Sequence, residues 1–350
     1  MHNLSLMTLY GLTKPFARPW YPSSMESGEP ETAFELLPLL RVHKNGRIER
    51  LIGTDFVPPG TDPLTGVTSK DVTIFPESGV SARLFLPNLT HSTQRLPLVV
   101  YFHGGCFCTQ SPFTAKYHNY LNALTAEAKV LAVSVNYRKA PEHPVPAAYE
   151  DSWAALQWAI SHCEGKGPEI WLNKHADFRR LFLAGASAGA NIAHNLAMLA
   201  GEPDYGENME LVGVALEHPY FWSSARTAKE AEDPMRTRLF ERLWGFICPA
   251  RPENDDPWVN PVAGGAARLA GMGSGRVLVC VAEKDVLRDR GRHYYEALAG
   301  SGWLGVAEIV ETEDEDHLFH LNDLEGQKAK DLIRRLGAFF NRDMPHSLLR

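Results

Sequence analysis

A serine between two glycines is the first residue in the sequence that could carry covalent chemistry. The pentapeptide Gly-Ala-Ser-Ala-Gly matches G-x-S-x-G and centres on Ser187. By itself it could be only a tight turn, but the apolar run Leu181–Gly185 leads into it and a helical pattern, Ala190–Ala200, follows. Such a strand-to-helix elbow presents the serine hydroxyl as a nucleophile at the carboxyl edge of a sheet. Gly185 and Gly189 suit an elbow because a Cβ would clash where strand and helix approach.

A serine nucleophile needs an acid that orients its base, and the acid should follow a later strand. The apolar run Arg276–Ala282 predicts such a strand. It is followed by Glu283-Lys284-Asp285, in which Asp285 lies at the expected place and Glu283 is the alternative.

The base should be a histidine after the next strand. The run Gly305–Val310 predicts that strand, and an acidic loop after it ends in His317. We expect His317 to be the base and His320 to be a packing or capping residue of the following helix.

Backbone amides beside the serine would have to stabilise a developing oxyanion. The strand predicted at Leu98–Phe102 is followed by His103 and then Gly-Gly-Cys, a turn that can direct N–H groups at a carbonyl oxygen. The amide after the nucleophile is the usual second donor. The candidate donors are Gly104, Gly105, Cys106 and Ala188.

The pattern of apolar segments explains how these residues could converge. An alternating pair of short runs predicts an antiparallel hairpin over 70–87, and six longer apolar runs predict buried parallel strands. Those runs are Leu96–His103, Val130–Tyr137, Leu181–Gly185, Leu211–Leu216, Arg276–Ala282 and Gly305–Val310. Helical patterns fill the gaps at Thr114–Ala128, Ala147–His162, Ala190–Ala200, Arg236–Ile247, Arg290–Ala299 and Leu324–Phe340. The alternation predicts an α/β fold with a mostly parallel, eight-stranded sheet flanked by helices.

Two segments lie outside this alternation and are candidates for a cap, 26–60 and 220–262. Residues 1–24 contain no Asp or Glu, and we expect a disordered extension or a transit peptide there, ahead of a single domain over 25–350. We expect a cytoplasmic protein, or a plastid one if residues 1–24 are a transit peptide.

Composition excludes several classes of protein. The 350 residues carry 35 Lys and Arg against 42 Asp and Glu, a net charge of −7, which makes nucleic acid an unsuitable partner. No apolar run reaches the roughly 20 residues that span a bilayer. Five cysteines, without a CxxC pair or an HExxH stretch, fit reduced thiols and give no support for a zinc site.

Several of these motifs together resemble the plant carboxylesterase family, in the hormone-sensitive-lipase branch of the α/β-hydrolases. The likeness rests on HGG at 103, GASAG at 185, AEKD at 282 and DEDH at 314, and on the stretches 34–51, 136–151 and 301–303. It implies an α/β-hydrolase fold with a helical cap, and Ser187 as nucleophile, Asp285 as acid and His317 as base. It also implies oxyanion donors from the loop after His103 and from Ala188.

Two residues depart from the family pattern. Cys106 stands where a third glycine is usual, so which two of the three loop amides donate is open. Ala186 stands where the family commonly has aspartate, which removes a local hydrogen bond at the elbow without touching the triad. Cys106 and Cys108 lie beside the site, but pocket lining is a simpler role for them than nucleophile.

Ester hydrolysis through an acyl-enzyme on Ser187 is the leading hypothesis, with a small-molecule ester as substrate and no metal or organic cofactor. The chain also resembles 2-hydroxyisoflavanone dehydratase and related plant cyclases, which makes a lyase the alternative. The third hypothesis is a hormone receptor of the gibberellin-receptor type. Those receptors resemble this family but lack the catalytic histidine, so the presence of His317 counts against it. Aromatic residues that could line a pocket, or equally pack in the core, are Phe107, Phe113, Tyr220, Phe221 and Trp222. A monomer and a homodimer are both open.

Overall fold

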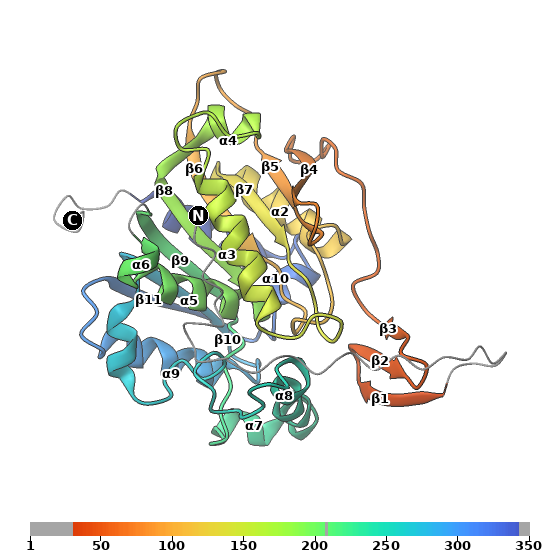
Figure 1. Cartoon of the computed structure of the whole chain (residues 1–350). Coiled ribbons are helices and arrows are strands. Elements are labelled where there is room, and N and C mark those ends of the chain that lie inside the picture. The colour runs from red at the N-terminus through yellow and green to blue at the C-terminus, as the bar shows by residue number, and fades with distance from the viewer. Residues whose placement is uncertain (1–30, 207–208, 343–350) are drawn as a thin grey trace.

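The computed structural model describes residues 31–206 and 209–342. Eight strands form the main sheet in the spatial order β11-β10-β9-β8-β6-β7-β5-β4 (Figure 1). Their bounds are β4 Thr68–Phe75, β5 Val80–Leu86, β6 Leu96–Phe102, β7 Leu131–Asn136, β8 Ala176–Ala186, β9 Leu211–Glu217, β10 Arg276–Ala282 and β11 Val306–Thr312. Only β5 pairs antiparallel with its neighbours β4 and β7 within this sheet. The predicted hairpin and the mostly parallel, eight-stranded sheet are confirmed.

Helices cover both faces of the sheet, as a sheet made of nearly continuous apolar strands requires. The helices over the described residues are α2 Ala115–Ala128, α3 Ala147–Ile160, α4 Ile170–His175, α5 Ala188–Ala200, α6 Pro203–Gly206, α7 Ala228–Glu232, α8 Pro234–Ile247, α9 Arg288–Ala299, α10 Phe319–Asn322 and α11 Gln327–Asn341, with a 3₁₀ turn at Ala266–Gly271. One apolar core joins α3, α5 and α9 to one face of the sheet, and a second core joins α2 and α11 to the other. No described helix is long and apolar enough to cross a membrane.

The described part of segment 26–60, one of the two cap candidates, contains a small antiparallel sheet. Its strands are β1 Thr32–Leu36, β2 Leu40–His43 and β3 Ile48–Arg50. The sequence Asn45-Gly46 explains the hairpin between β2 and β3, because Gly46 has φ 83°, which glycine adopts without strain.

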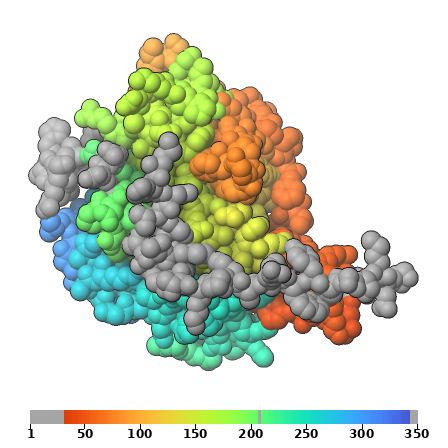
Figure 2. Space-filling model, in the orientation of Figure 1, coloured from red at the N-terminus to blue at the C-terminus, as the bar shows by residue number. Residues whose placement is uncertain are grey.

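Residues 220–262 contain the helices α7 and α8, which lie together beyond the lower end of the main sheet in Figure 1. The small β1–β3 sheet packs on α8, where the ring of Phe34 stacks on that of Phe246 with centroids 4.9 Å apart. The guanidinium of Arg242, also on α8, lies over the ring of Phe34, 5.1 Å from its centroid. The two segments therefore contact one another (Figure 2), although more than 200 positions separate the residues in contact.

The parallel strands place Ser187, Asp285 and His317 at one edge of the sheet. Strands β6, β8, β9, β10 and β11 run in the same direction, so their carboxyl ends lie side by side. The order of the strands reverses at the centre of this sheet, because later strands are added on the opposite side from earlier ones. Ligands of open α/β sheets bind at the carboxyl ends of the strands at such a reversal.

Candidate active site

Ser187 occupies a sharp turn between β8 and α5. Its backbone has φ 55° and ψ −114°, a conformation that residues other than glycine rarely adopt. The turn is held by the amide of Ser187, which donates to the carbonyl of Glu217 at 2.8 Å. A Cβ on Gly189 would lie 1.9 Å from the carbonyl oxygen of Phe102, and one on Gly185 would lie 2.4 Å from the backbone of Gly189. The two glycines thus let the helix start close against the end of β6, as the motif predicted.

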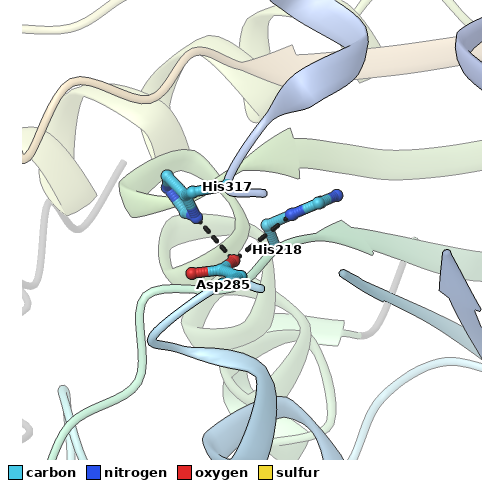
Figure 3. Close-up of side chains that lie close together, drawn as sticks. All are labelled: His218, Asp285 and His317. Carbon is cyan, nitrogen blue, oxygen red and sulfur yellow. Dashed lines mark hydrogen bonds and ion pairs between the residues drawn. The ribbon is translucent and has the colours of Figure 1, made fainter. Parts of the chain in front are cut away.

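The side chains of Ser187, His317 and Asp285 come together although they lie far apart in the sequence. Nε2 of His317 lies 3.1 Å from Oγ of Ser187, and its Nδ1 lies 2.7 Å from Oδ2 of Asp285. Figure 3 shows the second of these contacts, with the two side chains facing each other across the ends of β10 and β11. This is the geometry in which an imidazole can take a proton from a hydroxyl while a carboxylate orients it.

Asp285 remains ionised despite its burial. Burial by itself would raise the pKa of this carboxyl, but the nearby His317 and the hydrogen bonds from His218 and His317 outweigh it and hold the pKa well below its ordinary value. Only 1% of Asp285 is exposed, against 22% of the His317 side chain, so the base faces the open side of the group. Glu283, the alternative acid, instead accepts the amide of Asp314 at 2.7 Å and does not contact His317.

The loop after β6 passes directly beside the nucleophile. A Cβ on Gly104 would lie 3.2 Å from Cβ of Ser187, so the two backbones are in contact here. The amide of Gly104 donates to the hydroxyl of Tyr117 at 2.7 Å and is therefore turned away from a substrate. This contact removes Gly104 from the four candidate oxyanion donors.

Three candidate donors remain. Among the described residues, the amides of Gly105, Cys106 and Ala188 donate to no protein acceptor. Gly105 has φ 105° and Cys106 has φ 57°, so the turn that frees these amides passes through the left-handed region at both residues. The side chain of Cys106 does not prevent this conformation. Its thiol is protonated near neutral pH, since burial raises its pKa to about 12.

His103 supports the loop and faces away from the reaction. Its ring is fully buried and stacks on Tyr137 with centroids 4.2 Å apart, and the Tyr137 hydroxyl donates to the His103 carbonyl at 2.7 Å. Burial lowers the pKa of His103 to about 3, so the ring is neutral. The residue fixes the direction in which the chain leaves β6.

The sequence reasoning missed a buried polar layer behind the triad. Glu217 ends β9, His218 follows it, and both are buried. Oε2 of Glu217 lies 2.9 Å from Nε2 of His320 and accepts the hydroxyl of Tyr120 at 2.8 Å. His320 is thus a member of this layer and not only a packing residue. The available signal was the pair Glu-His at the end of the apolar run Leu211–Leu216, which is a polar interruption at the expected height of the site.

Burial sets the protonation of this layer. It raises the pKa of Glu217 to about 8, with partial opposition from the Tyr120 hydrogen bond and from His218. It lowers the pKa of His320 to about 3 and that of His218 to about 4. All three groups are therefore uncharged at neutral pH, next to an ionised Asp285.

The tentative pocket residues lie in different places. Phe107 is buried and packs edge-on against Tyr149 and Tyr220, so it belongs to the core under the loop. Trp222 is buried too, between Phe240 and Arg290. Phe113 lies over Arg83 and lines a hollow of about 420 Å³ with residues of β4, β5 and the segment 56–59. Core packing is the observed role of the first two, and Phe113 faces a different surface.

One group of three side chains has the residue types of a metal site. His218, Asp285 and His317 offer ligand atoms that all lie within 4.8 Å of one another. Two ligands of a tetrahedral zinc ion lie roughly 3.3 Å apart. The 2.7 Å between Nδ1 of His317 and Oδ2 of Asp285 is the length of a hydrogen bond instead. The present positions fit a shared proton better than an ion.

Comparison with known proteins agrees with this geometry. A family model described as the alpha/beta hydrolase fold matches residues 99–321. The chain is 46% identical over 319 residues to a probable carboxylesterase 2 of Arabidopsis thaliana. The alignment covers 91% of this chain and 99% of the relative. It is 44% identical over 311 residues to a 2-hydroxyisoflavanone dehydratase of Glycyrrhiza echinata, covering 87% of this chain and 95% of that enzyme.

Among solved structures, a hyperthermophilic esterase from Pyrobaculum calidifontis superimposes with a TM-score of 0.65 at 27% identity, over 78% of this chain and 84% of the esterase. With a fold and a strand-to-helix serine elbow of this kind, and with the matches above, the chain belongs to the α/β-hydrolase family.

Proposed function

We propose that this protein is a serine carboxylesterase that hydrolyses a small-molecule carboxylic ester through an acyl-enzyme on Ser187. One observation carries the proposal: Oγ of Ser187 lies 3.1 Å from an imidazole whose other nitrogen lies 2.7 Å from an ionised, buried carboxylate. The probable carboxylesterase and the solved esterase, whose names state an ester substrate, support it.

In the acylation step, His317 takes the proton of Ser187 as Oγ attacks the carbonyl carbon of the ester. The negative charge that develops on the carbonyl oxygen is stabilised by amides drawn from Gly105, Cys106 and Ala188. The imidazolium then protonates the departing alcohol, and the C–O bond to it breaks. Asp285 stabilises the imidazolium throughout without taking up the proton itself.

In the deacylation step, water attacks the acyl-enzyme while His317 accepts one of its protons. The proton returns to Oγ as the carboxylic acid leaves, so the enzyme recovers its starting state. The same amides stabilise the second oxyanion, which is why one loop serves both steps.

The experiment compares hydrolysis of p-nitrophenyl acetate by the wild type and by Ser187→Ala. We expect the variant to lose at least three orders of magnitude in kcat, because its nucleophile is absent. Ser152→Ala, which changes a buried serine on α3, is the matched control and should retain wild-type activity. A serine-reactive fluorophosphonate followed by peptide mass mapping should label Ser187 alone. Equal rates for the wild type and Ser187→Ala would contradict the proposal.

A lyase is the second candidate, since a relative of 44% identity is a 2-hydroxyisoflavanone dehydratase. In that case His317 would act as the base of an elimination and the amides would hold an enolate-like oxygen, with no acyl-enzyme. A β-hydroxy ketone offered as substrate separates the two: water loss without ester hydrolysis would favour the lyase. The hormone-receptor reading has less support, because the base is present and contacts the serine.

A further inference from the structure

Asp285 has a second histidine partner besides the proposed base. Oδ2 lies 2.7 Å from Nδ1 of His317 and 3.3 Å from Nδ1 of His218, while Oδ1 accepts the amide of Leu287 at 2.9 Å. Figure 3 shows both imidazoles in contact with the same carboxylate oxygen, one from the loop after β11 and one from the residue after β9. The carboxylate is thus held by two other segments of the chain and by an amide of its own loop.

His218 is itself fixed by its backbone and its neighbours. Its amide donates to the carbonyl of Cys280 on β10 at 2.8 Å, and its ring lies among those of His317, Phe319 and His320. Only 1% of the residue is exposed. It cannot reach a substrate, so any part it plays in the reaction must pass through Asp285 or through the loop that carries His317.

Nδ1 of His218 faces one hydrogen-bond acceptor and one hydrogen-bond donor. Asp285 requires a donor, whereas the amide of Leu318, 3.3 Å away, requires an acceptor. One imidazole nitrogen is either protonated or not. A hydrogen bond to a buried carboxylate is the stronger of the two, and Leu318 is only half-buried, so its amide can be hydrated. Nδ1 therefore carries the proton and donates to Asp285.

We propose that His218 is a positioning residue, which holds the Asp285 carboxylate in line with His317 by a hydrogen bond from Nδ1. The proposal rests on the proposed function, since it assigns His218 a part in the same proton transfer. A contact of the neighbouring residue supports the proposal: the carbonyl of Glu217 accepts a hydrogen bond from the amide of Ser187. Glu217, the last residue of β9, and His218, which follows it, thus contact the nucleophile elbow and the acid respectively, and fix their separation.

Two substitutions separate the hydrogen bond from the shape of the ring. His218→Phe keeps an aromatic ring but no nitrogen, whereas His218→Asn keeps an N–H near the position of Nδ1. Asparagine also tolerates the backbone here, where φ is 48°. We expect kcat for p-nitrophenyl acetate to fall by about ten- to a hundredfold in His218→Phe, the effect of one charge-assisted hydrogen bond. KM should be unchanged, and His218→Asn should stay within about threefold of the wild type.

The pH profile distinguishes positioning from a general loss of structure. A carboxylate that drifts from His317 stabilises its imidazolium less, so the acidic limb of kcat/KM should move to lower pH in His218→Phe and return in His218→Asn. Besides Asp285, the titratable groups that face the ring are His317, His320 and Glu217, and none is altered in either variant. His162→Leu removes a buried histidine remote from the site, between α3 and α4, and should leave the profile unchanged.

The nitrogen-15 shifts of the His218 ring in the wild type provide a test that needs no variant. A protonated, pyrrole-type Nδ1 is expected, and a pyridine-type Nδ1 would overturn the proposal even if His218→Phe fails to fold. Equal kcat values for His218→Phe and the wild type, or equal losses in His218→Phe and His218→Asn, would also overturn it. If the wild type neither turns over the ester nor reacts with the fluorophosphonate, the proposed function has failed instead.

Discussion

Two buried carboxyl groups at the ends of neighbouring strands have opposite protonation. Glu217 ends β9 and Asp285 follows β10, and neither is more than 1% exposed. The pKa of Glu217 is raised to about 8 by burial, whereas that of Asp285 lies well below its ordinary value. Both lose the solvation of their charged form, so burial alone does not explain the difference.

Their partners explain it. Glu217 is met by the hydroxyls of Tyr120 and Tyr101 and by a histidine that burial keeps neutral. Asp285 lies beside His317, which can become charged, and accepts hydrogen bonds from two imidazoles and one amide. The comparison teaches that a hydrolase site of this kind keeps one carboxylate ready to stabilise a cation and encloses a neutral acid directly behind it.

The largest effect should come from neutralising the charged member of the pair. Asp285→Asn keeps the size of the side chain but removes the charge that stabilises the imidazolium and selects its tautomer. We expect kcat for p-nitrophenyl acetate to fall by about 10³- to 10⁴-fold with little change in KM. Steady-state kinetics on the folded variant, verified by circular dichroism, provide the measurement. A loss of less than tenfold would mean that Asp285 is not the acid.

Replacing the neutral member, Glu217, by glutamine should affect the stability of the fold and its pH dependence far more than catalysis. Folded Glu217 releases its proton at about 8, against an ordinary pKa of 4.5. Between these values the folded state binds more protons than the unfolded state, so the free energy of unfolding falls as pH rises through this window. Glu217→Gln has no such loss. The free energy of unfolding of Glu217→Gln should exceed that of the wild type by nearly zero below pH 4.5 and by on the order of a few kcal/mol above pH 8.

Urea unfolding of the wild type and Glu217→Gln at several pH values measures this difference. The groups that face Glu217 and share the environment are Tyr101, Tyr120, His218, Cys280 and His320. We expect kcat at neutral pH to stay within about threefold of the wild type, since Gln preserves the uncharged state. A variant that is less stable than the wild type at pH 9 would show that folding does not raise the pKa of Glu217.

The smallest effect should follow substitution of the rival acid. Glu283 is two residues from Asp285 but accepts the amide of Asp314 and does not contact the base. We expect Glu283→Gln to keep kcat within about twofold of the wild type. A loss comparable to that of Asp285→Asn would reverse the assignment of the acid.

The order of the elements could be predicted because each is encoded locally. Buried parallel strands are nearly continuous apolar runs, and Arg276–Ala282 was located to the residue. The proximity of Ser187, Asp285 and His317 followed from topology, since parallel strands place their carboxyl ends at one edge. The small sheet over 32–50 was not predicted because the segment lies outside the βα alternation, although its Asn-Gly turn is a hairpin signal in the sequence.

The donors and the layer behind them could not be predicted with the same certainty. Gly104, Gly105 and Cys106 look equivalent as amides in the sequence, and only the position of the Tyr117 hydroxyl shows that the amide of Gly104 is already engaged. Likewise, His320 reads as a packing residue until Glu217, some hundred positions earlier, is found beside it. These pairings depend on how the loop and helices close over the sheet.

By itself, the sequence determined the class of fold, the elbow that presents Ser187, and the strands after which an acid and a base must come. Those features depend on local patterns and on the fixed direction of parallel strands. Only the tertiary structure decided which amides remain free, that Asp285 has two histidine partners, and that Glu217 is neutral. Hydrogen-bond partners and pKa values are set by atoms within a few ångströms, and in this protein those atoms come from segments far apart in the chain.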